Sequence, residues 1–111
     1  MFHTWVALTR SGDYQRPHVH TGATISCVYY VTIPDCPSPQ GRIDFITPID
    51  VQEMTFLPNF SYGRITFDPQ PGGLLIFPSY LRHYTQPFYG DGDRICVVSN
   101  VYVNIRQPPS I

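Results

Sequence analysis

The chain has 111 residues, of which 42% are hydrophobic and 14% aromatic, and its formal net charge is -1 at pH 7. This length is typical of one domain, and the apolar content is high enough for a packed core, which excludes a disordered chain. A net charge so close to zero gives no electrostatic reason to expect binding to nucleic acid or to an anionic membrane.

The N-terminus shows no basic stretch followed by an apolar run, so the sequence predicts no signal peptide. No segment approaches the roughly 18 consecutive apolar residues of a membrane span. The cysteines are Cys27, Cys36 and Cys96, an odd number without the spacing of a metal site. Cys27 and Cys96 lie in apolar runs and are predicted to be reduced core residues, so we expect a cytoplasmic protein.

Short apolar runs rich in β-branched and aromatic residues, with no sustained helical repeat, predict strands. In chain order, the predicted strands are Phe2–Thr9, Ile25–Ile33, Arg42–Ile46, Met54–Leu57, Arg64–Phe67, Leu74–Phe77, His83–Pro87 and Arg94–Ile105. Segment 34–41 is predicted to be a loop and segments 67–73 and 88–93 to be turns, with a hairpin turn at 91–93. This pattern indicates a single all-β domain over residues 1–111, either a sandwich or a small barrel.

Two histidines, His18 and His20, lie one residue apart just ahead of the predicted strand Ile25–Ile33. In an extended backbone, residues i and i+2 point to the same face, so the two rings would lie close together. A third histidine, His83, follows the predicted strand Leu74–Phe77 after a short turn. Two ligands close in sequence and a third from a distant strand are typical of non-haem Fe(II) sites, although imidazole also binds zinc, copper and nickel.

Each of these histidines also has a simpler interpretation. His18 and His20 could be exposed imidazoles on a loop, and His83 could cap a turn. Asp44 could supply a carboxylate ligand if His20 turned outward, whereas His3 is expected to face solvent or a partner. Ser79 is expected to form a turn, because no G-x-S-x-G motif surrounds it.

Arg94 begins an otherwise apolar predicted strand. An arginine that enters a buried strand needs an anionic partner, because an unpaired buried charge is very costly. Its planar guanidinium matches a carboxylate in a two-point contact, so a carboxylate-bearing cosubstrate could bridge Arg94 to a metal. The alternative is an ordinary ion pair with Asp68, Asp91 or Asp93.

These features together resemble the family of 2-oxoglutarate/Fe(II)-dependent oxygenases of marine bacteria and their phages. The similar motifs, in chain order, are Trp5, Gly12 and Asp13, PHVH at 17–20, SCVYY at 26–30, GRIDF at 41–45, PGGLLIFPSYLRH at 71–83 and RICVVSN at 94–100. They cover most of the chain, and five of them in the right order are more specific than any one alone.

The resemblance implies a double-stranded β-helix, or jelly roll, similar to cupins. It implies Fe(II) held by His18, His20 and His83, with 2-oxoglutarate as cosubstrate and O₂ as the oxidant. Arg94 would bind the distal carboxylate of 2-oxoglutarate. Tyr29 or Tyr30 would add a hydrogen bond to it, and strand alternation allows only one of these two tyrosines to face inward.

Three residues depart from the family pattern. His20 stands where related enzymes commonly have aspartate, which leaves the iron site with one more positive charge. Cys96 replaces a serine and is a weaker hydrogen-bond donor to a carboxylate. Cys27 replaces a glycine and adds volume. The chain also lacks N-terminal helices that many relatives carry, so it could be a minimal core, a fragment, or a protomer that needs a partner such as a second copy.

The leading hypothesis is therefore a dioxygenase that hydroxylates a C–H bond of a small molecule or of a protein side chain. One alternative is a cupin-like enzyme with a three-histidine metal site that does not use 2-oxoglutarate. The other is a non-catalytic jelly roll that serves in binding or assembly. The orientation of Arg94 discriminates between the first two hypotheses, and the separation of the histidines tests the third.

Overall fold

The computed structural model describes residues 1–46 and 64–103, which form seven strands and no helix. The strands are β1 (Phe2–Thr9), β2 (Ile25–Thr32), β3 (Ile43–Ile46), β4 (Arg64–Phe67), β5 (Leu74–Pro78), β6 (Arg82–Thr85) and β7 (Arg94–Val101). The all-β prediction is confirmed, and β1 and β4 have the predicted bounds. The predicted strand Met54–Leu57 and the last two residues of Arg94–Ile105 lie outside the described ranges. Within those ranges no helix could cross a membrane.

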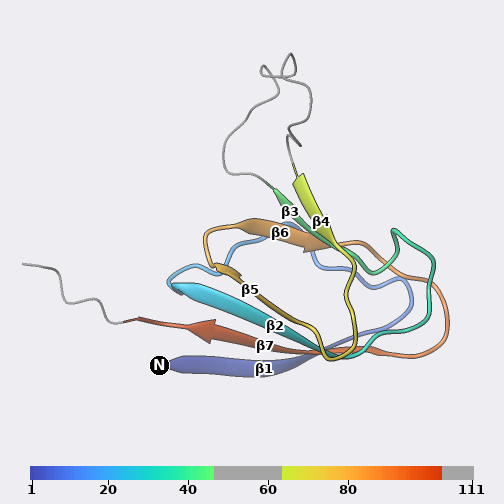
Figure 1. Ribbon diagram of the computed structural model, residues 1–111, viewed down its shortest axis with the longest axis horizontal. Helices are drawn as coiled ribbons and strands as arrows, with labels where there is room; N and C mark the ends of the chain where they lie inside the picture. Colours follow the sequence, from blue (N-terminus) through green and yellow to red (C-terminus); the bar gives the residue numbers. More distant parts are fainter. Residues whose placement is uncertain (47–63, 104–111) are drawn as a thin grey trace, which may run out of the picture.

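The strands form two antiparallel sheets, one with the order β1-β7-β2-β5 and the other with the order β4-β3-β6 (Figure 1). The chain changes sheet between β2 and β3, β4 and β5, β5 and β6, and β6 and β7. Segment 88–93 therefore links β6 in the small sheet to β7 in the large one, and the hairpin turn predicted at 91–93 is wrong. Gly92 has the positive φ (98°) that a tight bend requires, but the two strands take their hydrogen-bond partners from elsewhere.

The core lies between the inner faces of the two sheets. It is formed by Val28, Tyr30, Ile43, Phe45, Phe77 and Cys96. The rings of Phe45 on β3 and Phe77 on β5 meet edge to face at 4.8 Å and join the sheets. Cys96 is a buried core residue as predicted, whereas Cys27 points to the opposite face of β2 and is only half-buried, so that prediction is wrong. All three cysteines are free thiols.

The outer face of the large sheet is also apolar. Val6 and Leu8 on β1, Tyr29 on β2 and Ile76 on β5 are exposed there, with Val6 and Ile76 about two-thirds accessible. Because both faces carry apolar side chains, hydrophobic alternation along these strands does not indicate which face is inside.

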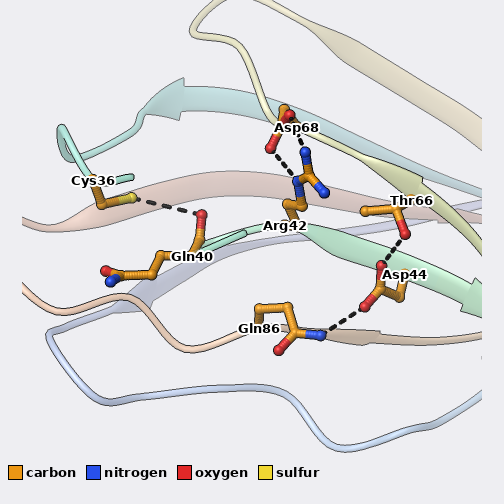
Figure 2. A network of polar contacts seen from close by, with 7 residues as sticks. All are labelled: Cys36, Gln40, Arg42, Asp44, Thr66, Asp68 and Gln86. Atoms are coloured by element: carbon orange, nitrogen blue, oxygen red, sulfur yellow. Dashed lines mark hydrogen bonds and ion pairs between the residues drawn. The ribbon is translucent and has the colours of Figure 1, made fainter. Parts of the chain in front are cut away.

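A separate polar network lies on the small sheet (Figure 2). Asp44 on β3 is 1% exposed and accepts hydrogen bonds from the Thr66 hydroxyl and, at 2.8 Å, from the Gln86 amide. Burial alone would raise the pKa of Asp44, but these hydrogen bonds outweigh it and keep that pKa below its usual value. Beside it, Arg42 makes a bidentate ion pair with Asp68, with N–O distances of 2.6 and 2.9 Å. The network therefore links Asp44 at the centre of β3 to β4 and to the residue that follows β6.

Replacing Asp44 tests this network. Asp44→Ala leaves the half-buried donors of Thr66 and Gln86 without an acceptor and should lower the free energy of unfolding by about 1–3 kcal/mol. Asp44→Asn should lose less, since it keeps one acceptor. Urea denaturation at neutral pH measures both effects.

The pH dependence of the Asp44→Asn effect provides a control. The folded-state pKa of Asp44 lies below its unfolded value of about 3.9, so its contribution is complete above that value and is lost as the pH falls through the folded pKa. The difference between wild type and Asp44→Asn should therefore shrink in acid. Equal stability of the two proteins at pH 7 would contradict this account.

Candidate metal and cosubstrate site

His18 and His20 are held in place by the strand that carries His83. They lie in an irregular segment between β1 and β2, not at a strand edge as predicted. The backbone N–H of His18 donates to the carbonyl of His83 at 3.0 Å, and the N–H of His83 donates back at 3.1 Å. The N–H of His20 donates to the carbonyl of Ser79 at 3.2 Å. These bonds join residues 59 to 65 positions apart in the sequence.

The three histidine rings converge. One nitrogen from each of His18, His20 and His83 lies within 4.8 Å of the others, and Nε2 of His20 is 3.3 Å from Nε2 of His83. Two nitrogens that bind one ion at about 2.1 Å lie roughly this far apart. The expectation that the histidines meet is therefore confirmed, and the interpretations of separate loop and turn histidines are wrong.

Two of the three rings have a defined tautomer. Nδ1 of His18 contacts the carbonyl oxygen of Arg16, and Nδ1 of His83 contacts that of Leu81 at 2.9 Å. Because a carbonyl can only accept, each Nδ1 carries the hydrogen, and each Nε2 keeps a free lone pair. This arrangement is typical of metal-binding histidines, whose second nitrogen is fixed by an outer hydrogen bond.

The environment keeps the imidazoles of His83 and His20 neutral. Burial lowers the pKa of His83 to about 4, against the opposing effect of its hydrogen bond to Leu81. Burial, and then the neighbouring His18, also lower the pKa of His20. Neutral imidazole is the form that binds a metal ion, so both rings are in that form at neutral pH.

One cavity between the two sheets contains the histidines and Arg94 together. Its walls are formed by Trp5, Ala7, Thr9, Gln15, His18, His20, Val28, Tyr30, Ile43, His83, Thr85, Arg94, Cys96 and Val98. Sequence reasoning did not single out Thr9, Gln15 or Thr85. Alternation could have found Thr85, which lies two residues after His83 on β6, whereas Thr9 is placed by its pairing with Arg94 across β1 and β7.

Arg94 is buried without a carboxylate partner. It is 6% exposed, and its Nε has no hydrogen-bond partner within the described part of the chain. Two of the aspartates considered above pair elsewhere, Asp93 with Arg10 at 3.7 Å and Asp68 with Arg42. The guanidinium carbon lies 5.4 Å from the centre of the Tyr30 ring, a cation–π contact. The site therefore presents a desolvated cation on the cavity wall that a carboxylate would match.

The structure distinguishes the two tyrosines. Tyr30 is 1% exposed and lines the cavity, and its hydroxyl has no partner among the described residues. Tyr29 faces outward and is 43% exposed, so it cannot contact a ligand in the cavity, and its assignment to the site is wrong. Burial raises the pKa of Tyr30 to about 12 and also raises that of Cys96, so both remain neutral hydrogen-bond donors.

Two other candidates lie away from the cavity. Asp44 pairs with Thr66 and Tyr84 across the small sheet, whereas His83 pairs with Phe45. The side chain of Asp44 thus points to the opposite face from His83 and cannot replace His20 as a ligand. His3 is exposed, as expected, and its ring contacts Trp5 edge to face at 5.2 Å.

The chain belongs to a known family. The family model described as "Putative 2OG-Fe(II) oxygenase" matches residues 3–100. Members of this family are oxidoreductases that use Fe(II), 2-oxoglutarate and O₂, and the cavity contains groups that fit such cofactors: three converging imidazoles and a buried arginine that makes no ion pair with the described residues. The resemblance inferred from the sequence motifs is confirmed.

Two solved structures share the fold. A Pseudomonas putida prolyl-4-hydroxylase is 19% identical with a TM-score of 0.68, over 93% of this chain and 53% of its own. An oxidoreductase of the 2OG-Fe(II) oxygenase family from Burkholderia pseudomallei is 11% identical with a TM-score of 0.63, over 90% of this chain and 44% of its own. The jelly-roll prediction is confirmed, and the chain spans about half the length of these proteins. No curated protein matches the sequence.

The unpaired charge of Arg94 has a consequence for stability. Arg94→Met removes a buried cation but keeps a similar length, so the metal-free protein should unfold at the same or a higher urea concentration, with a gain of up to about 2 kcal/mol. Arg42→Met, which breaks an ion pair at the surface, is the matched control and should leave the urea midpoint nearly unchanged. A large loss for Arg94→Met would mean that Arg94 has a structural partner.

Proposed function

We propose that this protein is a 2-oxoglutarate- and Fe(II)-dependent dioxygenase that hydroxylates a C–H bond of a small molecule or of a protein side chain. His18, His20 and His83 hold Fe(II), and Arg94 binds the distal carboxylate of 2-oxoglutarate. The observation that supports this most strongly is that a buried arginine, which makes no ion pair with the described residues, shares one cavity with three converging imidazoles.

The proposed reaction converts 2-oxoglutarate, O₂ and the substrate into succinate, CO₂ and the hydroxylated product. When bound, Fe(II) supplies the centre at which O₂ is activated. The chain supplies binding and orientation. The guanidinium of Arg94 donates two parallel N–H bonds to the carboxylate, and the Tyr30 hydroxyl donates to the same end of the molecule. The apolar walls, which include Val28, Ile43 and Val98, keep water away from the reacting groups.

The ligand set has no carboxylate. With His20 in place of an aspartate, the three protein ligands are neutral and the ion keeps its full double charge. The dianionic cosubstrate would then be the main source of negative charge in the cavity, which couples its binding closely to that of the metal.

The same ligand set supports a second candidate function, a three-histidine metal enzyme of the cupin type that does not use 2-oxoglutarate. In that case no anionic group in the described part of the chain would neutralise Arg94. The burial of Arg94 away from any described carboxylate partner therefore favours the dioxygenase, whereas the neutral ligand set favours the alternative.

An anaerobic titration distinguishes the two functions. Addition of 2-oxoglutarate to the Fe(II)-loaded protein should produce the weak visible charge-transfer band of bidentate chelation. Arg94→Lys keeps the charge but loses the two-point contact, so the affinity for 2-oxoglutarate should fall about 10- to 100-fold. Fe(II) binding should be unchanged, because the ligands are intact.

His83→Ala serves as the control and should abolish both metal binding and the band. Tyr29→Phe changes only an outward-facing side chain and should behave like wild type. A wild-type protein that binds Fe(II) but shows no band with 2-oxoglutarate would reject the dioxygenase in favour of the cupin-type alternative.

A further inference from the structure

His20 differs from the other two histidines in what its second nitrogen contacts. Nδ1 of His18 and of His83 faces a backbone carbonyl, but Nδ1 of His20 lies 3.3 Å from the side-chain amide nitrogen of Asn100. A carbonyl can only accept, whereas an amide can donate through nitrogen or accept through oxygen. Of the three histidines, His20 is therefore the one whose tautomer depends on a side chain, Asn100, that can act as donor or as acceptor.

Asn100 is the first link in a buried chain of polar groups. Its Oδ1 accepts a hydrogen bond from the Ser26 hydroxyl at 2.9 Å, and Ser26 contacts the Ser79 hydroxyl, also at 2.9 Å. Asn100 on β7, Ser26 on β2 and Ser79 just after β5 are 6%, 0% and 1% exposed. These three buried polar side chains thus form one continuous hydrogen-bonded network with His20. Such a network is costly to bury unless its members are paired.

The directions of these bonds agree with one another. Nδ1 of His83 donates to Leu81, so its Nε2 must accept, and the 3.3 Å contact requires Nε2 of His20 to donate. Nδ1 of His20 is then an acceptor, which the Asn100 amide nitrogen satisfies. Asn100 accepts in turn from Ser26, and Ser26 from Ser79. In this arrangement the hydrogen of His20 lies on Nε2, the nitrogen that faces His83.

That arrangement is incompatible with metal binding through Nε2. A ligating Nε2 must be free of hydrogen, so the hydrogen of neutral His20 must move to Nδ1, which then needs an acceptor. Rotation of the Asn100 amide by a half-turn brings Oδ1 to His20 and the amide nitrogen to Ser26. The two hydroxyls can reverse as well, because each can donate or accept. Each of these buried groups keeps at least one hydrogen bond, and no net proton is taken up.

We propose that Asn100 is a positioning residue that selects the tautomer of His20, and that the chain from Asn100 through Ser26 to Ser79 reverses its direction when a metal ion binds. The proposal rests on the function proposed above, in which His20 is a ligand. It explains how a histidine can occupy this ligand position while the metal-free cavity keeps its polar groups satisfied.

Ring-nitrogen NMR of the full-length chain tests the reversal directly. With ¹⁵N-labelled histidine, the metal-free protein should show His20 protonated at Nε2, and the Zn(II)-loaded protein should show it protonated at Nδ1. His18 should carry its hydrogen on Nδ1 in both states. A metal-free His20 already protonated at Nδ1 would overturn the proposal.

Metal affinity gives a second readout, measured with Co(II) and Zn(II) at pH 8. Asn100→Leu removes the amide and should weaken binding about 10- to 100-fold. Asn100→Asp can only accept, which favours hydrogen on Nδ1, so it should bind at least as tightly as wild type. Ser26→Ala should weaken binding less than Asn100→Leu. Equal affinity of wild type and Asn100→Leu would overturn the proposal.

A matched control lies on the outer face of the same strand. Ser99 on β7 also makes a cross-strand hydroxyl contact, to Thr4 at 2.8 Å, but it points away from the cavity. Ser99→Ala should leave Co(II) affinity unchanged. If Asn100→Leu fails to fold, the wild-type NMR experiment still decides the question.

The two proposals fail in different ways. Absence of Co(II) and Zn(II) binding by wild type would reject the metal site itself. Metal binding without a change of the His20 tautomer would reject only the role of Asn100.

Discussion

The site depends on a pair of backbone hydrogen bonds between His18 and His83. These two bonds, 3.0 and 3.1 Å long, connect an irregular segment to β6 in the small sheet. Together with the N–H bonds from His20 to Ser79 and from Thr85 to the carbonyl of Gln15, they hold the segment between β1 and β2 so that His18 and His20 face the cavity. The bonds form between main-chain atoms, so they position both side chains without using any atom that a ligand needs.

Around this bridge, the two sheets provide the rest of the cavity from their inner faces. The large sheet contributes Arg94, Cys96 and Tyr30, and the small sheet contributes His83 and Thr85. Among residues 1–46 and 64–103, Arg94 at 6% exposure has no ion pair and the Tyr30 hydroxyl beside it has no hydrogen-bond partner, and both are unfavourable for folding. Groups of this kind are expected where a protein keeps binding capacity at the expense of stability. The polar network of Asp44, by contrast, is fully paired and lies on the other face of the small sheet.

The three histidines also differ in whether the hydrogen-bond partner of their second ring nitrogen can change its role. The neighbouring ligands have their tautomers fixed by backbone carbonyls, which cannot change role. His20 contacts an amide instead, and the amide leads to two buried hydroxyls. All of these groups can exchange donor and acceptor roles. A neutral ligand thus comes with an environment that can adapt to the presence or absence of the ion, which a fixed acceptor could not do.

The sequence by itself determined the features that depend on neighbouring residues. Strand positions such as Phe2–Thr9 and Arg64–Phe67 follow from local composition, and the common direction of His18 and His20 follows from the period of an extended backbone. The burial of Arg94 could be inferred because its strand is otherwise apolar.

Only the tertiary structure decided what depends on pairing between distant segments. The choice of Tyr30 over Tyr29, the outward position of Cys27 and the passage of segment 88–93 between sheets were of this kind. Alternation could not decide them because the outer face of the large sheet is also apolar. The contact of Asn100 with His20 was not predicted either, since it joins residues eighty positions apart through the register of β7. Such contacts follow from long-range strand pairing, which local sequence does not encode.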